Sequence, residues 1–163
     1  MSNFDIDFGP WINYGNANKT DEIGLKMLEL TTREWSPFNG QDMAKVFIFC
    51  MAYGFSKKRI PVSPPGSGSM PASAFDQEMR NCMKFVAVAS KKDLDVITNA
   101  KEVVKICEGY AYAAFLDVYY KIKNRNSSIQ PPVVLESLIQ EEHHPSLMEG
   151  TRDEENNPSN TEE

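Results

Sequence analysis

Apolar residues crowd most densely in the segment from Met43 to Tyr53, where almost no polar side chain interrupts them. A helix without a polar face is stable in water only when other elements surround it. The pattern therefore predicts a central core helix over residues 41–53. Asn39 can cap its start, and Gly54 suits the left-handed position that commonly ends a helix.

Two more helices follow from apolar spacing later in the chain. Ser73 and Asp76 have capping spacing before a helix with apolar residues between 79 and 89. Asn99 and Glu102 have the sequence pattern of a capping box, which opens the longest helix. Its apolar residues recur at i, i+4 and i+7 from Val103 to Ile122, the spacing of one buried stripe. The helix narrows at three alanines, where the core helix or a second chain could approach closely: Ala111, Ala113 and Ala114.

The remaining segments complete a mostly helical, single-domain protein. Thr20 can cap a helix over about residues 21–32, and residues 133–140 could add two helical turns. The N-terminal aromatic residues fit neither a clean helix nor a clean strand, so we expect an arm that lies across the core. The fold class predicted is all-α, a bundle of about four to five helices. The chain divides into an aromatic arm (1–19), a helical domain (20–126) and an acidic, largely disordered tail (127–163).

The segment between residues 60 and 72 contains four prolines and two glycines, which predicts a loop. Its GSGS sequence has no Gly-Lys-Ser/Thr after it and no hydrophobic strand before it, so a phosphate-binding loop is excluded. Loops of this length are often functional or disordered. For this one we predict disorder.

The net charge of −6 is distributed unevenly. Residues 1–134 contain 14 acidic and 16 basic residues, a balance of +2, whereas residues 135–163 contain nine acidic residues and one arginine. The acidic value of the whole chain therefore does not exclude a basic surface on the body. No run of about 18 apolar residues suggests a membrane span, and the acidic N-terminus lacks a signal-peptide core. We expect a cytoplasmic location.

Few residues have the spacing of a metal or catalytic site, and we predict no metal, no cofactor and no enzymatic activity. The three cysteines lie one on each apolar helix without a C-x-x-C spacing, and we interpret them as small buried hydrophobic residues: Cys50, Cys82 and Cys107. His143 and His144 are sequence neighbours in the tail and would need a third ligand to hold a metal. A nuclease with two carboxylates assembled from distant segments stays open as an alternative.

Basic residues gather where the core helix and the last helix end. These are the candidate nucleic-acid contacts, and we expect them to share one face if they act together: Lys57, Lys58, Arg59, Lys121, Lys123 and Arg125. Cations at helix C-termini also stabilise the helix dipole without any ligand. The tyrosines of the last helix could stack on bases, although a phenol that is half in a core is ordinary.

The order of these signatures, over roughly residues 35–124, resembles one protein family. PF precedes the core helix, YGF and basic residues end it, and a Pro/Gly loop follows. VAVAS, KDLDVITNAKEV and EGYAYAAF come next in the same order. The chain resembles the Dnd system-associated accessory family, small proteins of bacteria and archaea encoded beside DNA phosphorothioation genes. The resemblance rests on helical signatures without a catalytic motif.

The resemblance implies an accessory or adaptor protein of a restriction or antiviral defence system linked to DNA phosphorothioation. Its partners would be larger proteins of that system, with the DNA backbone as a further contact without sequence specificity. The acidic tail would bind a partner or compete with DNA for basic surfaces. Two alternatives are a DNA-binding regulator of the helix-turn-helix type and an oligomeric scaffold without nucleic-acid contact.

Overall fold

The computed structural model describes residues 8–16, 21–68, 70–125 and 131–140. This part of the chain forms an all-α fold, as the sequence predicts, with a single pair of two-residue strands and two short 3₁₀ turns. The five α-helices are α1 (Glu22–Thr32), α2 (Met43–Ser56), α3 (Gln77–Lys91), α4 (Ala100–Lys123) and α5 (Pro131–Gln140).

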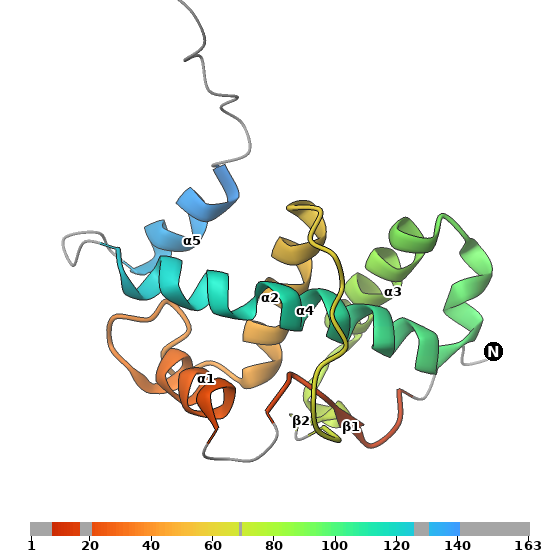
Figure 1. The fold of residues 1–163 in the computed structure, drawn as a ribbon, viewed down its shortest axis with the longest axis horizontal. Helices are drawn as coiled ribbons and strands as arrows, with labels where there is room; N and C mark the ends of the chain where they lie inside the picture. Colours follow the sequence, from red (N-terminus) through yellow and green to blue (C-terminus); the bar gives the residue numbers. More distant parts are fainter. Residues whose placement is uncertain (1–7, 17–20, 69, 126–130, 141–163) are drawn as a thin grey trace, which may run out of the picture.

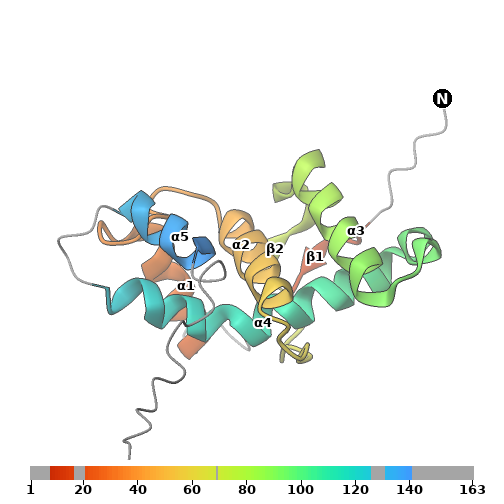
Figure 2. The same cartoon turned by 90° about the horizontal axis from the view of Figure 1, so that it is seen from above.

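Helix α4 is the axis of the fold and runs along the long dimension of the molecule (Figure 1). α2 crosses it near the middle, α1 and α5 lie towards its C-terminal end, and α3 lies towards its N-terminal end (Figures 1 and 2). The α4 stripe from Val103 through Cys107 and Ala114 to Val118 is fully buried, as its spacing predicts. Phe47 of α2 is 1% exposed, so the predicted core helix is confirmed.

The helix starts show which capping signals act. The Asp76 carboxylate accepts a hydrogen bond from Met79 N at 2.9 Å, and the Asn99 side chain accepts one from Glu102 N at 3.2 Å. The second half of the predicted capping box does not form, because Glu102 pairs instead with Lys91 at 3.0 Å. The residue before α2 is Asp42 rather than Asn39, and its side chain makes no capping hydrogen bond. The Asp21 side chain caps α1 by accepting a hydrogen bond from Gly24 N at 2.7 Å.

Gly54 does not end α2, so that prediction is wrong. The helix continues to Ser56, and the left-handed residue after it is Lys58, with φ of 53°. Gly54 instead faces α4, where an added Cβ would lie 2.5 Å from the Tyr110 carbonyl oxygen and 3.1 Å from Ala114 Cβ. The backbone of α2 therefore lies close to α4 at its small residues. Of the two neighbours expected there, the core helix and a second chain, the core helix is the one that the structure shows.

The segment from 60 to 68, predicted to be disordered, lies against α4 and the N-terminal arm. Val62 N donates to the Gly109 carbonyl oxygen at 3.1 Å. The Asn13 side-chain amide donates to the carbonyl oxygens of Pro65 and Gly66 at 2.9 and 3.1 Å. These long-range hydrogen bonds supply the order that the local Pro/Gly composition does not reveal.

The N-terminal arm contributes to the core as expected. Phe8 and Tyr14 are buried, whereas Trp11 is 54% exposed. β1 (Trp11–Ile12) pairs antiparallel with β2 (Met70–Pro71), which ties the arm to the segment before α3. Residues 1–7 and 17–20, Thr20 among them, lie outside the described residues.

Helix α5 lies within the range assigned to the tail, yet it belongs to the folded body. Its Leu138 is fully buried, and Leu138 and Ile139 line a hollow together with residues of α2. The two helical turns that the sequence allows at residues 133–140 are therefore confirmed. The predicted disorder of residues 141–163, and both histidines, fall outside the described residues. No helix in the described ranges is long and apolar enough to cross a membrane.

Candidate functional site

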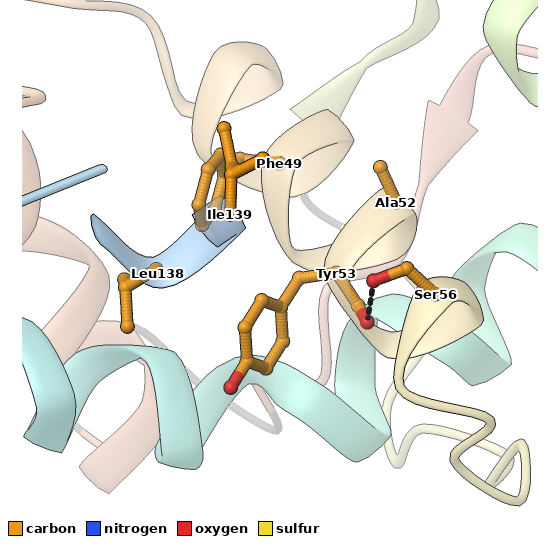
Figure 3. Close-up of a pocket in the computed structure, with 6 residues that line it drawn as sticks. All are labelled: Phe49, Ala52, Tyr53, Ser56, Leu138 and Ile139. Carbon is orange, nitrogen blue, oxygen red and sulfur yellow. Dashed lines mark hydrogen bonds between the residues drawn. The ribbon is translucent and has the colours of Figure 1, made fainter. Parts of the chain in front are cut away.

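An apolar hollow of the described surface lies between α2 and α5. We call it the α2–α5 groove, and it measures about 250 Å³. Figure 3 shows the side chains that line it, four from α2 and two from α5: Phe49, Ala52, Tyr53, Ser56, Leu138 and Ile139. The Ser56 hydroxyl is turned to the Tyr53 carbonyl oxygen, to which it donates at 3.0 Å, so it is already partnered.

The all-round apolar composition of α2 creates this groove. α4 covers one face of α2, and α5 covers only part of another. Phe49 is held by an edge-to-face contact with Phe38, 5.5 Å between ring centroids, and it stacks on Tyr53 at 6.3 Å. Ala52 is exposed and Ile139 is 59% exposed, so apolar surface stays open to solvent here.

Tyr53 joins the groove to a cluster of charges. Its ring lines the groove while its hydroxyl points away from it towards α4 (Figure 3). The hydroxyl accepts a hydrogen bond from Lys121 Nζ at 2.8 Å and donates to Asp117 Oδ2 at 3.3 Å. Arg59 Nη2 binds the same carboxylate oxygen at 2.6 Å. We call these four residues the Tyr53 cluster.

Cations also surround the ring itself. The ammonium groups of Lys57 and Lys121 each lie 5.5 Å from the centroid of the Tyr53 ring. Aromatic faces attract cations at this distance. Lys58 is exposed next to Lys57. Positive charge therefore gathers beside Tyr53 at the C-terminal end of α2. We call these residues the basic rim: Lys57, Lys58, Arg59 and Lys121.

The six candidate nucleic-acid residues do not form one uninterrupted face. Asp117 draws Arg59 and Lys121 together, with Lys57 nearby on the Tyr53 ring. Lys123 instead contacts Glu29 of α1, and Arg125 hydrogen-bonds to Ser137 of α5. The C-terminal end of α2 meets α4 at Asp117, before α4 ends, so the two helix ends are not alongside each other.

Glu29, Tyr119 and Lys123 form a second polar group, the Tyr119 cluster. The Tyr119 hydroxyl donates to Glu29 Oε2 at 2.5 Å, and Lys123 contacts both, at 3.1 Å from Glu29 and 2.7 Å from Tyr119. The hydrogen bonds from Tyr119 and then from Lys123 lower the pKa of Glu29. Burial raises the pKa of Tyr119, which is 2% exposed. This cluster joins α1 to α4.

The Tyr119 cluster should make stability depend on acidity. Because the folded-state pKa of Glu29 is depressed, its ionised form stabilises the protein above the ordinary glutamate value of about 4.3, and this stabilisation is lost as the pH falls through the lower folded value. Urea midpoints measured from pH 6 to pH 3 should therefore fall, and Glu29→Gln should reduce that fall. The exposed Glu34→Gln is the control. If the urea midpoints of the two variants fell equally as the pH is lowered, Glu29 would not be the source of this pH dependence.

The cysteines differ from the sequence interpretation at one position. Cys50 and Cys107 are buried, and burial raises the pKa of both thiols, whereas Cys82 is exposed on α3. Cys82 lies on the exposed side of that helix, so the burial predicted for it is wrong. Within the described residues, no group of three or more His, Cys, Asp or Glu side chains is placed to hold a metal ion.

A second apolar hollow, of about 200 Å³, lies between α3 and the 3₁₀ turn at Leu94–Thr98. We call it the α3 hollow. Phe85 and Leu94 stand at its surface, 73% and 71% exposed. Its lining contains one lysine, Lys84, and no cluster like that around Tyr53. It therefore serves as a comparison site for the α2–α5 groove.

Sequence reasoning found the basic rim but missed the groove beside it. Ala52, Leu138 and Ile139 carry no motif, and their one signal is the apolar character of both segments. No protein-family model, curated protein or solved structure matches the chain. The function is therefore argued from the groove, its rim and the sequence resemblance.

Proposed function

We propose that this protein is a non-enzymatic adaptor that holds a larger protein of a DNA phosphorothioation-linked restriction or antiviral defence system in its α2–α5 groove. The observation that carries the proposal is a groove with an apolar lining and an exposed mouth, with four cations gathered beside its Tyr53. The resemblance described above supports the choice of system. No catalytic step is needed for this role.

The chemistry of the groove defines the partner segment. Apolar side chains would displace water from Phe49, Ala52 and Ile139, a burial that contributes about 25 cal/mol per Å². Carboxylates beside them would face Lys57 and Lys58 of the basic rim. An amphipathic helix with acidic flanks has both properties, and helix-in-groove docking is a common mode of peptide recognition.

The burial of the helices favours an adaptor over a helix-turn-helix regulator, and an oligomeric scaffold can be tested separately. A helix-turn-helix regulator needs a polar recognition helix that can enter a DNA groove. Apolar residues of both helices are buried from Ala44 to Gly54 in α2 and from Val103 to Ile122 in α4, which favours a role for these helices in the core over one as a recognition helix. A homo-oligomeric scaffold would use the same groove for a second copy, which light scattering of the purified protein would reveal.

The test is retention of a partner through the groove. The tagged full chain is co-expressed, in turn, with each sulfur-transfer and restriction protein encoded beside phosphorothioation genes. Ala52→Glu places a charge in the apolar lining and repels acidic flanks, so retention of the bound protein should fall at least tenfold, which corresponds to about 1.4 kcal/mol. Leu94→Glu, the same change of charge at the α3 hollow, is the matched control.

The outcomes separate clearly. If the partner protein is lost from Ala52→Glu and retained by Leu94→Glu, the result supports the groove as the docking site. Equal loss in both variants, with both folded by circular dichroism, would place the interface elsewhere. If none of these proteins is retained by the unsubstituted chain, the assignment to this defence system is wrong.

DNA-backbone contact is the second candidate, because three consecutive cations stand at the end of α2 and Lys58 is exposed among them. Binding to a random-sequence duplex should be weak and should fall steeply between 50 and 200 mM salt, because neutralised phosphates release counterions. Joint charge reversal, Lys57→Glu with Lys58→Glu, should abolish it for any sequence. Persistence of binding in that variant, measured by fluorescence anisotropy, would exclude the rim as the contact.

A further inference from the structure

A polar hollow lies between the end of α3, the first turns of α4 and the loop that follows α2, and it measures about 490 Å³. We call it the α3–α4 cleft. Hollows of about 300–1,000 Å³ commonly hold small molecules. We infer that this cleft binds a nucleoside monophosphate. The binding does not depend on the adaptor role, because the cleft and the α2–α5 groove have no lining residue in common.

One wall of the cleft is a loop that is held against the backbone of α4. Val62 N donates to the Gly109 carbonyl oxygen at 3.1 Å. Pro61 lies so close that a Cβ added to Gly109 would be 2.8 Å from the Pro61 Cβ, so this approach requires a residue without a side chain. Pro61 and the buried Ile106 supply the apolar part of the lining. An apolar wall suits the face of a nucleobase, and every base has such a face.

Hydrogen-bond donors dominate the polar part of the lining. Lys91 and Lys105 bring ammonium groups, and Ser63 and Ser90 bring hydroxyl groups. The Ser90 hydroxyl is oriented by the Tyr110 hydroxyl, 3.0 Å away. A lining of this kind favours a ligand that is rich in acceptor oxygens. A phosphate monoester has three such oxygens and carries a charge of about −1.5 to −2 at neutral pH.

The two lysines of the cleft differ in how far their charge is already paired. Lys91 Nζ lies 3.0 Å from Glu102 Oε1. Lys105 is exposed and forms no ion pair with the described part of the chain. We therefore assign the phosphate to Lys105, with the serine hydroxyls as further donors. Hydrogen bonds between an ammonium group and a phosphate are among the stronger ones in proteins.

Glu102 provides the second point of recognition. The hydrogen bond from Lys91, and to a lesser extent the charge of Lys105, lower the pKa of Glu102, so its carboxylate is ionised at neutral pH. An ionised carboxylate only accepts hydrogen bonds. The hydroxyl groups of a ribose donate them, and a carboxylate that binds a ribose hydroxyl is a recurrent feature of nucleotide sites. Inorganic phosphate has no sugar to offer, and Glu102 would repel it.

These three parts of the lining match the three parts of one ligand. Lys105 faces the phosphate, Glu102 faces the sugar, and the wall of Pro61 and Ile106 faces the base. The sequence gave no sign of this arrangement, because its residues come from three segments and form no motif. The apolar wall does not distinguish between bases, so we expect all four common ribonucleoside monophosphates to bind.

An NMR titration of the ¹⁵N-labelled full chain tests the inference. The probes are the monophosphates of adenosine, guanosine, cytidine and uridine at millimolar concentrations, with adenosine and inorganic phosphate as the separate parts. Backbone amide signals from the lining should move, those of Val62, Ser63, Ser90 and Gly109 among them. Adenosine monophosphate should bind at least about tenfold more tightly than either part, because it makes the contacts of both.

Two exposed lysines of α4 supply a matched pair of variants. Lys105→Ala removes the phosphate contact and should weaken binding of adenosine monophosphate about tenfold while leaving adenosine unaffected. Lys101→Ala removes the same charge four residues earlier on the helix, outside the lining, and should change neither. The amide spectrum of each variant shows directly whether it is folded.

Three results would overturn the inference. These are no binding of any of the four nucleotides, signal changes that lie outside the cleft, and equal weakening by Lys101→Ala and Lys105→Ala, which would indicate general attraction between charges. Partner retention in the groove is measured separately. Its loss with Ala52→Glu, together with a failed titration, would leave the adaptor role standing, and a successful titration without any retained partner would leave the nucleotide site standing.

Discussion

Replacing Phe47 with alanine should lower the free energy of unfolding by about 3–5 kcal/mol, the usual cost of removing a large aromatic side chain from a core. Phe47 is 1% exposed and meets the Phe75 ring edge-to-face, with 5.5 Å between centroids. The ring therefore joins α2 to the segment that leads into α3.

Urea denaturation monitored by circular dichroism measures this loss. Phe85→Ala is the matched control, because it removes the same side chain from a position that is 73% exposed, and it should cost less than about 1 kcal/mol. A loss below about 1 kcal/mol for Phe47→Ala would show that α2 is peripheral and that its place in the core is wrong.

Gly54→Ala should also destabilise the protein, by about 1–3 kcal/mol or more, the range for overpacking. Helix propensity alone predicts the opposite sign, since alanine is favoured over glycine by about 1 kcal/mol inside a helix. The close approach decides between the two effects. The added Cβ would lie 2.5 Å from the Tyr110 carbonyl oxygen, a backbone atom that cannot turn aside.

The measurement is whether the urea midpoint of Gly54→Ala rises or falls relative to that of the unsubstituted protein. A rise in the urea midpoint of Gly54→Ala would show that α2 and α4 are further apart than the structure places them. A fall would confirm that the crossing of the two helices depends on a residue without a side chain. It would also confirm that Gly54 acts by close packing, since the helix ends two residues later.

The helices were predictable because their signals are local. Spacing located α2, α3 and α4, and Asn99 caps α4 as the sequence indicates, whereas Asp76 alone, of the pair Ser73 and Asp76, caps α3. Gly54 was misassigned because a glycine that ends a helix and a glycine that admits a neighbouring helix look the same in one sequence. The order of residues 60–68 depends on distant partners such as Gly109, which local composition does not contain.

The site was predictable only in part, because its contacts also join segments that are far apart in the sequence. Basic residues could be located, but not the carboxylates that they contact. Asp117 joins Arg59 and Lys121, whereas Glu29 draws Lys123 to α1. The groove combines two segments far apart in the sequence, so its shape exists only after α5 has packed beside α2. Sequence therefore indicated charge at this surface and gave no sign of the apolar surface next to it.

Site-specific photo-crosslinking tests the central claim, that partner proteins dock in the α2–α5 groove. A benzoylphenylalanine in place of Ala52 is compared with one in place of Leu94, in cells that also produce the phosphorothioation-linked proteins. The account predicts that position 52 links to one of those proteins, through a peptide with apolar residues and acidic flanks, and that position 94 does not. Equal linking from both positions, or linking from position 94 alone, would contradict it.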